Sequence, residues 1–346
     1  MQTKDVHYSD YLQLDKILNA QTLESDLLGA HAHDEMLFVI IHQAYELWFK
    51  QILFEVDSVA AIMSQQVIND NSPDLQTIVH RLNRVATILK VAVHQIDIME
   101  TMTPMDFLDF RDFLRPASGF QSWQFKIVEA KLGLQFPERF GQEYYISQLR
   151  PEHVALIKDV EKKPSLLDLV DEWLGRMPFF DLKESWENYR PLFPVTEGKH
   201  PFWSDYSIVY ANSLVEGEKG NKAHFEKMFF ETEKSPGRRL SAAACRSALF
   251  IMLYRGYPML QLPFQLLNNL LEIDEQLSTW RYRHVNMVTR MIGVRTGTGG
   301  SSGRDYLKGA LDKHYIFKEI AGLTGYLIER RRLPQLSKEV EEKLGF

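Results

Sequence analysis

The sequence predicts an all-α fold, and three observations support this prediction. Apolar residues recur at helical spacing along most of the 346 residues. No alternation of apolar and polar residues runs long enough to build a sheet. The composition, 45% hydrophobic and 25% charged, is that of a globular protein with a large core. We expect antiparallel helices in a single domain over 1–346, with an N-terminal arm over 1–20 and a small inserted segment, helical or irregular, over about 178–237.

The first long helix is expected over 34–64. Asp34 and Glu35 suit a first helical turn, where negative charge meets the positive end of the helix dipole. The run from Met36 to Ile41 is apolar throughout, so we expect the start of this helix to be buried on every face. Residues 75–100 carry an apolar stripe at helical spacing and predict a second long helix.

Shorter helices are expected to follow. The run from Thr103 to Asp106 combines a capping residue, a first-turn proline and an acidic third position, and Pro116 ends the helix that this run opens. Prolines, glycines and charges interrupt the pattern in the inserted segment, and the stretch 216–222 is expected to be exposed. Further helices are expected over 119–133, 152–175, 240–256, 263–292 and 304–329, with a glycine-rich loop before the last.

Charge and composition exclude several classes of protein. The net charge is −6 and the basic residues form no block, so nucleic acid is not an expected partner. The longest apolar run, from Met36 to Ile41, is far too short to cross a bilayer, so no membrane is expected either. Cys245 is the single cysteine, which rules out a disulfide framework within the chain. Together with an N-terminus that lacks an apolar signal region, this predicts a cytoplasmic protein.

His284 lies on the apolar stripe of the helix expected over 263–292. A buried imidazole needs partners for both ring nitrogens, because an unpaired buried polar atom costs about 1–3 kcal/mol. Spacing alone favours a core histidine bonded to a neighbouring helix. The alternative is an axial ligand to a haem iron, and such a haem would be non-covalent because the sequence has no Cys-x-x-Cys-His. The stripe consists of Leu266, Leu270, Ile273, Leu277, Trp280, His284, Met287 and Met291.

His42 shares a helical face with three aromatic residues, Phe38, Tyr45 and Phe49. An imidazole beside aromatic rings could orient a flat aromatic ligand and accept a hydrogen bond from its N–H. The alternative is a structural polar contact to another helix, which the spacing alone favours. Both interpretations stay open at this point.

Arg111 lies among phenylalanines, one helical turn after Phe107. A guanidinium in such surroundings needs an anion, and a carboxylate matches its two-pronged geometry. The anion could be Asp109, Asp112 or another acid of the fold, or it could be the carboxylate of a ligand.

Two other stretches carry polar groups in suggestive arrangements. His31-Ala-His33-Asp34-Glu35 superficially resembles a metal site, but we interpret it as the N-terminal turn of a helix because no completing ligands are evident. Gly297-Thr298-Gly-Gly-Ser-Ser-Gly303 lacks the lysine of a phosphate-binding loop. It is either a flexible connector or a lid that supplies backbone N–H groups and the Thr298 hydroxyl to a polar ligand.

Five motifs taken together resemble the tryptophan 2,3-dioxygenase family. The resemblance runs from Tyr8 to about Pro334 and is weakest between about 180 and 237. None of the motifs is specific alone, but five in the same order are a strong signal. They are Tyr8-Ser-Asp-Tyr-Leu12, His33-Asp-Glu-Met-Leu-Phe-Val-Ile-Ile-His-Gln-Ala-Tyr-Glu-Leu-Trp48, Phe110-Arg-Asp-Phe-Leu-Arg-Pro-Ala-Ser-Gly-Phe-Gln-Ser122, Trp280-Arg-Tyr-Arg-His284 and Gly297-Thr-Gly-Gly-Ser-Ser-Gly303.

The resemblance implies a large helical haem-dioxygenase domain of the indoleamine/tryptophan dioxygenase type. The implied reaction inserts both atoms of O2 across the indole C2–C3 bond of L-tryptophan and gives N-formyl-L-kynurenine, the first step of the kynurenine route. The implied cofactor is one non-covalent haem b per subunit, active as Fe(II). The implied assembly is a homotetramer, a dimer of dimers, in which N-terminal arms complete neighbouring active sites.

The same resemblance assigns roles to individual residues. His284 is the axial ligand of the haem iron, and Ser118 lies near the haem edge. His42 is the catalytic distal histidine, which faces the indole N–H. Arg111 clamps the substrate carboxylate, and Thr298 binds the amino acid head group. The other implied substrate-binding residues are Phe38, Val39, Ile40, Ile41 and Phe107 and, from a neighbouring subunit, Tyr8, Tyr11 and Leu12.

Three other functions are alternatives to this one. The first is a haem monooxygenase acting on a substituted indole, although Arg111 and Thr298 favour a substrate with an amino acid head group. The second is a haem-based sensor, which needs an output module that the sequence does not show. The third is a helical scaffold without a cofactor.

Overall fold

The computed structural model describes residues 5–65, 72–141, 146–177, 179–180, 183–232, 237–293, 295, 309, 311 and 313–345. In these ranges the regular elements are helices and no strand occurs, so the all-α prediction is confirmed. No helix in the same ranges is both long and apolar enough to cross a membrane.

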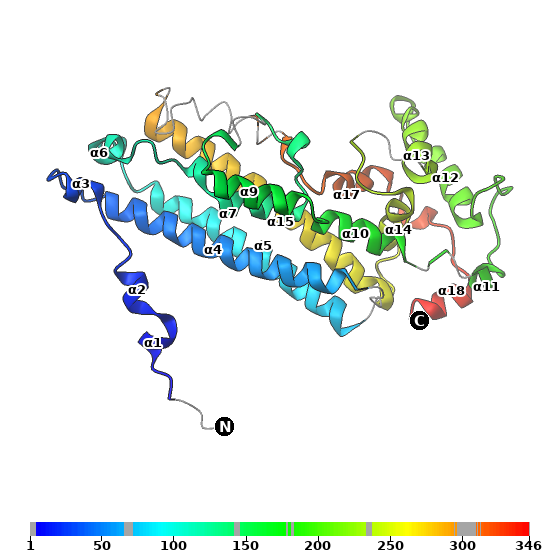
Figure 1. Ribbon diagram of the computed structural model, residues 1–346. Helices are drawn as coiled ribbons and strands as arrows, with labels where there is room; N and C mark the ends of the chain where they lie inside the picture. The colour runs from blue at the N-terminus through cyan, green and yellow to red at the C-terminus, as the bar shows by residue number, and fades with distance from the viewer. Residues whose placement is uncertain are drawn as a thin grey trace.

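Three long helices form the body of the molecule: α4 (Glu35–Met63), α5 (Pro73–Met99) and α15 (Pro258–Ile292). α5 packs against both of the others. α4 and α5 run antiparallel, whereas α15 runs in the same direction as α5 (Figure 1). α15 starts before the predicted position because Pro258 fits a first helical turn, and Pro263 is accommodated within the helix.

The expectation that the start of α4 is buried on every face is wrong. Ile41 is 4% exposed, but Met36 and Ile40 are 39% and 48% exposed. The two exposed residues are four apart, so they share one helical face of α4. Helices α5 and α7 pack against other faces of α4.

Two shorter helices pack against α4, namely α7 (Trp123–Leu132) and α10 (Leu166–Gly175), and α9 (Pro151–Glu161) packs against α7. The single helix predicted over 152–175 is wrong, because Pro164 lacks an N–H and disfavours the helical conformation of its predecessor. Ser165 then caps α10, and its side chain accepts a hydrogen bond from the Asp168 N–H at 3.3 Å.

α6 (Pro104–Arg111) begins as the sequence predicts. The Thr103 hydroxyl accepts a hydrogen bond from the Asp106 N–H at 3.3 Å, and the Asp106 carboxylate accepts one from the Thr103 N–H at 2.8 Å. This capping box fixes the start of the helix. The helix ends at Arg111 and passes into a 3-10 turn over Asp112–Leu114, just before Pro116.

The inserted segment is more regular than its sequence suggests. It contains α11 (Lys183–Trp186), α12 (Pro201–Ser213) and α13 (Asn221–Phe230), which gather beside α14 (Ala242–Leu253) at one end of the molecule (Figure 1). Residues 216–220 are exposed, as predicted. Buried aromatic side chains stabilise this group because they remove large apolar areas from water. They include Phe202, Trp203, Tyr206, Phe225 and Phe229, each at most 1% exposed.

The single helix predicted over 304–329 is wrong for the part that the structure describes. α17 (Lys318–Gly322) lasts five residues and passes into a 3-10 helix over Leu323–Tyr326. Glycines at the end of α17 and within the 3-10 helix disfavour a longer helix. A second 3-10 helix over Arg330–Arg332 and α18 (Lys338–Lys343), which the pattern did not predict, complete the described chain.

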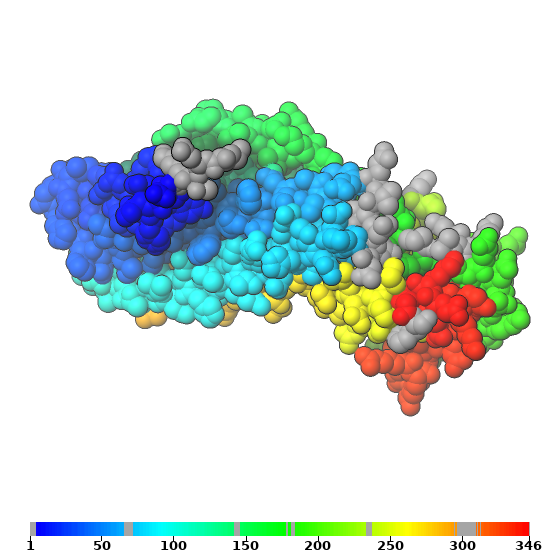
Figure 2. Space-filling model, turned by 90° about the horizontal axis from the view of Figure 1, so that it is seen from below, coloured from blue at the N-terminus to red at the C-terminus, as the bar shows by residue number. Residues whose placement is uncertain are grey.

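The N-terminal arm stands away from the bundle. α1 (Tyr8–Leu12) and α2 (Leu14–Leu18) contain no buried residue. Both helices project from the face of α4 and α5, as two perpendicular views show (Figures 1 and 2). The arm joins the body at Gln43 of α4, whose amide bonds to Gln21 at 2.8 Å and to the Ala20 carbonyl at 3.0 Å. α3 (Glu24–Leu27) then leads into α4.

Candidate functional site

The predicted site residues of α4, α6 and α15 gather at one end of the bundle. The N-terminal part of α4, the C-terminal part of α15 and the whole of α6 lie at the end opposite to α11–α14 (Figure 1). Direct ring contacts connect the side chains at this end. The fold therefore brings together residues that are more than 240 positions apart in the sequence.

His42 is held within its own helix. Its Nδ1 lies 2.7 Å from the Phe38 carbonyl oxygen. Because a carbonyl can only accept, Nδ1 carries the proton and Nε2 is left as an acceptor. Burial lowers the pKa of His42, and this effect outweighs the Phe38 carbonyl and the Glu46 charge, which both raise it. His42 is therefore a neutral imidazole at pH 7.

His284 is held differently. Its ring stacks on Trp280, with the ring centroids 5.1 Å apart and the planes inclined by 17°. Its Nδ1 is buried and has no hydrogen-bond partner among the described residues. Burial, with a smaller contribution from the nearby His42, lowers the pKa of His284 to about 4. Spacing alone favoured a core histidine bonded to a neighbouring helix. At His284 Nδ1 the described residues provide no such hydrogen bond.

Aromatic rings form the walls around the two imidazoles. Phe38 lies 4.2 Å from the His42 ring, 5.8 Å from Phe107 and 5.6 Å from Phe110, all measured between ring centroids. On the other side, Tyr45 lies 6.5 Å from His42 and 6.0 Å from Trp280. A continuous set of rings thus connects His42, the candidate distal histidine, with His284, the candidate axial ligand.

Arg111 directly follows Phe110, one of these rings, in the sequence. It is the last residue of α6 and is 4% exposed, next to the fully buried Phe110. Asp112, one of its candidate partners, pairs with Arg115 at 3.1 Å. Ser118 lies farther along the same connection, where its hydroxyl accepts a hydrogen bond from the Phe120 N–H at 3.4 Å and caps a 3-10 helix over Gly119–Gln121.

The remaining predicted residues are more dispersed. Ile41 lies in the main core, Ile40 is on an exposed face of α4, and Val39 is half-buried. Tyr8 and Tyr11 are 70% and 74% exposed on the arm. The same arm carries Leu12, which is half-buried. Thr298 and the glycine-rich stretch over 297–303 lie outside the described residues.

Sequence reasoning gave no role in the site to Tyr45, Phe110 or Trp280. Phe110 follows Phe107 by three residues and so shares its helical face, a signal that was available. The contact between Tyr45 and Trp280 joins α4 to α15, and no spacing within one helix reveals it. Tyr45 was predicted only to share the helical face of His42, and Phe110 and Trp280 were noted only within apolar patterns and motifs.

The described residues fit a haem. No group of three or more His, Cys, Asp or Glu side chains in the described ranges could hold a metal ion by itself. A haem iron needs only an axial protein ligand, because its macrocycle supplies the other nitrogens. A neutral imidazole stacked on an aromatic ring, whose buried Nδ1 has no hydrogen-bond partner among the described residues, matches such a ligand in charge and surroundings.

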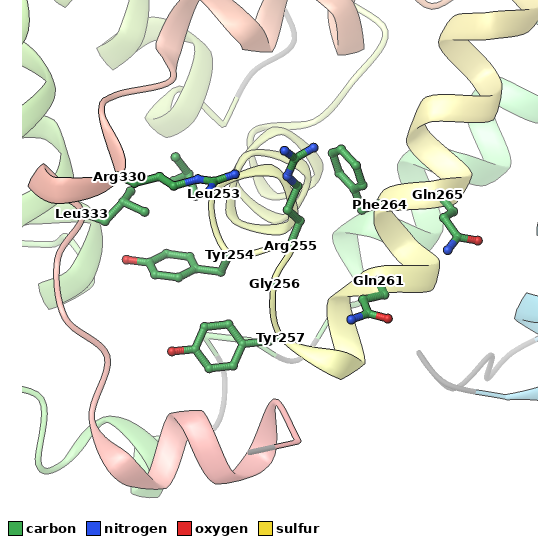
Figure 3. Close-up of a pocket in the computed structure, with 10 residues that line it drawn as sticks. All are labelled: Leu253, Tyr254, Arg255, Gly256, Tyr257, Gln261, Phe264, Gln265, Arg330 and Leu333. Carbon is green, nitrogen blue, oxygen red and sulfur yellow. The ribbon is translucent and has the colours of Figure 1, made fainter.

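A surface pocket lies far from these residues. It has a volume of about 570 Å³ at the start of α15 (Figure 3). Its nearest α15 residue, Gln265, precedes His284 by 19 positions, which corresponds to roughly 28 Å along a helix. The pocket is therefore separate from the two histidines. It is lined by Leu253, Tyr254, Arg255, Gly256, Tyr257, Gln261, Phe264, Gln265, Arg330 and Leu333.

Comparison with known proteins agrees with the resemblance in the motifs. A family model described as tryptophan 2,3-dioxygenase matches residues 1–327. A tryptophan 2,3-dioxygenase of Alteromonas mediterranea is 44% identical, covering 98% of this chain and 97% of its own length. The enzyme of that name from Bdellovibrio bacteriovorus is 40% identical over 100% and 99% of the two chains. The one from Dictyostelium discoideum is 42% identical over 99% and 89%.

Proposed function

Because the chain belongs to the tryptophan 2,3-dioxygenase family and is thereby an enzyme that dioxygenates tryptophan, we propose that it does so with haem. The proposed reaction adds both atoms of O2 across the indole C2–C3 bond of L-tryptophan and yields N-formyl-L-kynurenine, the entry to the kynurenine route. The observation that carries the proposal is the pair of neutral imidazoles, His42 and His284, within one set of aromatic rings.

His284 is the proposed protein ligand of a non-covalent haem b, one per subunit. Its low pKa leaves the ring neutral, and a neutral imidazole is the form that binds iron. When bound, ferrous haem supplies the activation of O2 that no side chain offers. Trp280 supports the ring from one face, and Ser118 is proposed to lie near the edge of the macrocycle.

The other residues bind and orient the substrate in this proposal. His42 presents an unprotonated Nε2, which can accept the hydrogen bond of an indole N–H. Phe38 and Phe107 pack against a flat ring. Arg111 binds the substrate carboxylate bidentately, since a buried guanidinium favours a planar anion. Thr298 is proposed to bind the head group of the same amino acid.

The assembly is proposed to be a homotetramer in which each arm completes a neighbouring site. The support is the exposure of Tyr8 and Tyr11, large aromatic side chains that their own subunit leaves uncovered. Leu12 lies on the same short helix. O2 and L-tryptophan are the proposed small-molecule partners.

One experiment tests the reaction directly. L-tryptophan is added anaerobically to the reduced, haem-loaded protein, O2 is then admitted, and the near-ultraviolet absorption of N-formyl-L-kynurenine is followed. We expect a change of the haem spectrum with substrate, followed by product with two added oxygen atoms in its mass. A product with a single added oxygen would indicate a monooxygenase instead. Absence of both the spectral change and the product would overturn the proposal.

A further inference from the structure

A cluster of charged side chains is buried between α7 and α15, one helical turn from His284. Glu129, Arg139, Arg281 and His314 are each at most 4% exposed. The Glu129 carboxylate accepts hydrogen bonds from Arg281 Nη2 at its Oε1 and from Arg139 Nη1 at its Oε2, both at 2.6 Å. Burying charges is costly unless they are closely paired. None of these four residues has a part in the reaction described above.

His314 completes the cluster. Its Nε2 accepts a hydrogen bond from the Phe140 N–H at 3.0 Å, so the ring proton is on Nδ1, which faces Glu129 Oε1 at 3.7 Å. Arg281 Nη1 donates to the His314 carbonyl at 3.1 Å. Burial alone would raise the pKa of Glu129, but Arg139, His314 and Arg281 hold it well below its usual range. Glu129 therefore keeps its negative charge.

A second contact joins the same two helices beside the cluster. Phe125 of α7 packs against Trp280 of α15, with the ring centroids 5.0 Å apart. Phe125 and Glu129 are four residues apart and share a face of α7. They meet Trp280 and Arg281, which are consecutive on α15. One apolar contact and one ionic contact at adjacent positions resist rotation of α15 about its axis.

We propose that Glu129 and Arg281 are positioning residues for His284. The ion pair fixes the orientation of α15 three residues before the histidine. Trp280, held between α7 and α4, carries this constraint to His284 because its ring stacks directly on the imidazole. The inference rests on the proposed function, in which His284 is the haem ligand.

Asp274 offers a matched control on the same helix. It is 5% exposed, and its two oxygens accept hydrogen bonds from the N–H groups of Ile316 at 3.0 Å and Phe317 at 2.7 Å. It precedes His284 by ten residues, roughly 15 Å along the helix. Asp274→Asn therefore weakens a buried contact of α15 without touching α7.

The test measures haem affinity rather than turnover. Haem is titrated into the cofactor-free wild type and into the Glu129→Gln, Arg281→Lys and Asp274→Asn variants, with circular dichroism to establish folding. We expect Glu129→Gln and Arg281→Lys to bind haem about 10- to 100-fold more weakly, the range for partners that orient a metal ligand. We expect Asp274→Asn to bind haem as the wild type does. Arg281→Lys keeps the buried positive charge, so this variant provides the test if Glu129→Gln does not fold. Equal affinities in the three variants would overturn the inference.

A second measurement separates positioning from general stability. In a His284→Gly background, added imidazole can replace the side chain without any link to α15. Glu129→Gln should then cause no further loss of haem affinity, because it has no histidine left to position. The same loss in both backgrounds would contradict the inference. If the wild type binds no haem, or His284→Gly without imidazole binds it as the wild type does, the proposed function itself fails.

Discussion

His42 and His284 are both neutral imidazoles, but different contacts hold their rings in place. His42 is fixed by a hydrogen bond to the Phe38 carbonyl of its own helix, which leaves Nε2 free to accept. His284 is fixed by stacking on Trp280, and its Nδ1 has no partner in the described chain. The first arrangement suits a residue that accepts a hydrogen bond from substrate. The second leaves a neutral ring whose Nδ1 is bonded to no described residue, which suits a metal ligand.

The role of Arg111 can be tested by substrate binding. Arg111→Gln removes the charge but keeps a polar side chain of similar reach. We expect it to lose about 2–3 kcal/mol of L-tryptophan binding, the upper part of the range for hydrogen bonds to charged groups, which is roughly a 30- to 150-fold rise in Kd. Equilibrium titration of the reduced, haem-loaded enzyme measures this. The binding of indole, which has no carboxylate, serves as the control and should not change; an equal loss for both ligands would contradict the carboxylate role.

His200 predicts a pH dependence of stability. Its Nδ1 accepts a hydrogen bond from the Phe202 N–H at 3.2 Å and caps α12. Burial, helped by the Arg246 charge, lowers its pKa to about 4. Between about pH 6.5 and 4 the unfolded chain binds a proton that the folded one does not, so the free energy of unfolding falls as pH falls. The slope for one such group is at most about 1.4 kcal/mol per pH unit.

The His200→Asn variant removes this titration but keeps a side chain that can cap a helix. Denaturant unfolding at several pH values should show a shallower loss of stability below about pH 6.5 than in the wild type. His224→Asn, which replaces an exposed histidine of α13, is the control. Identical pH profiles for the wild type and His200→Asn would contradict the assignment.

At the scale of elements, the end of α7 depends on Gly133. This residue has a φ of +140°, and a Cβ built there lies 2.8 Å from Leu167 Cβ and 3.2 Å from Ile316 Cγ2. We expect Gly133→Ala to lower the free energy of unfolding by about 2–4 kcal/mol, because backbone strain and overpacking add. Thermal or denaturant unfolding measures the change.

Gly175 provides the comparison for Gly133. It is the last residue of α10, and a Cβ there meets only Ser241 Oγ at 3.8 Å, an ordinary contact. Gly175→Ala should leave stability unchanged or raise it by about 0.5–1 kcal/mol, since alanine favours the helix. Equal effects of the two substitutions would show that position 133 is not special.

Elements with a local signal could be predicted from the sequence, and the others could not. The capping box of Thr103 and Asp106 and the stripe of α5 depend on residues close in sequence, and both predictions are confirmed. Pro164 and Ser165 also carried a local signal, which the reading of 152–175 as one helix overlooked. The insertion was underestimated because its helices bury aromatic residues such as Trp203 and Phe229 against each other, a long-range contact.

The same distinction applies to the candidate site. Helical spacing alone placed Phe38, His42 and Tyr45 on one face, and the ring contacts confirm it. The meeting of Tyr45 with Trp280 depends on how α4 and α15 pack. The structure does not test the assignment of Thr298, which lies outside the described residues.

At the scale of the whole molecule, the N-terminal arm predicts shared active sites. A variant lacking residues 1–19 should fold and bind haem but lose L-tryptophan turnover, because neither α1 nor α2 buries a side chain in its own subunit. Coexpression with Arg111→Gln subunits should restore turnover. In mixed oligomers, an intact arm of the second subunit then completes the intact pocket of the truncated one. Coexpression with Arg111→Gln subunits that also lack 1–19 should restore nothing, and failure of the first mixture would contradict arm exchange.

The central claim is that the end of the bundle between α4 and α15 holds a haem through His284. The absorption spectrum of the ferrous protein, with and without anaerobic L-tryptophan, tests it most directly. We expect the wild type to show a haem Soret band that responds to L-tryptophan. We expect His42→Ala to retain haem and His284→Ala to lose it or bind it with an altered spectrum. An unchanged ferrous haem spectrum in His284→Ala would contradict the claim.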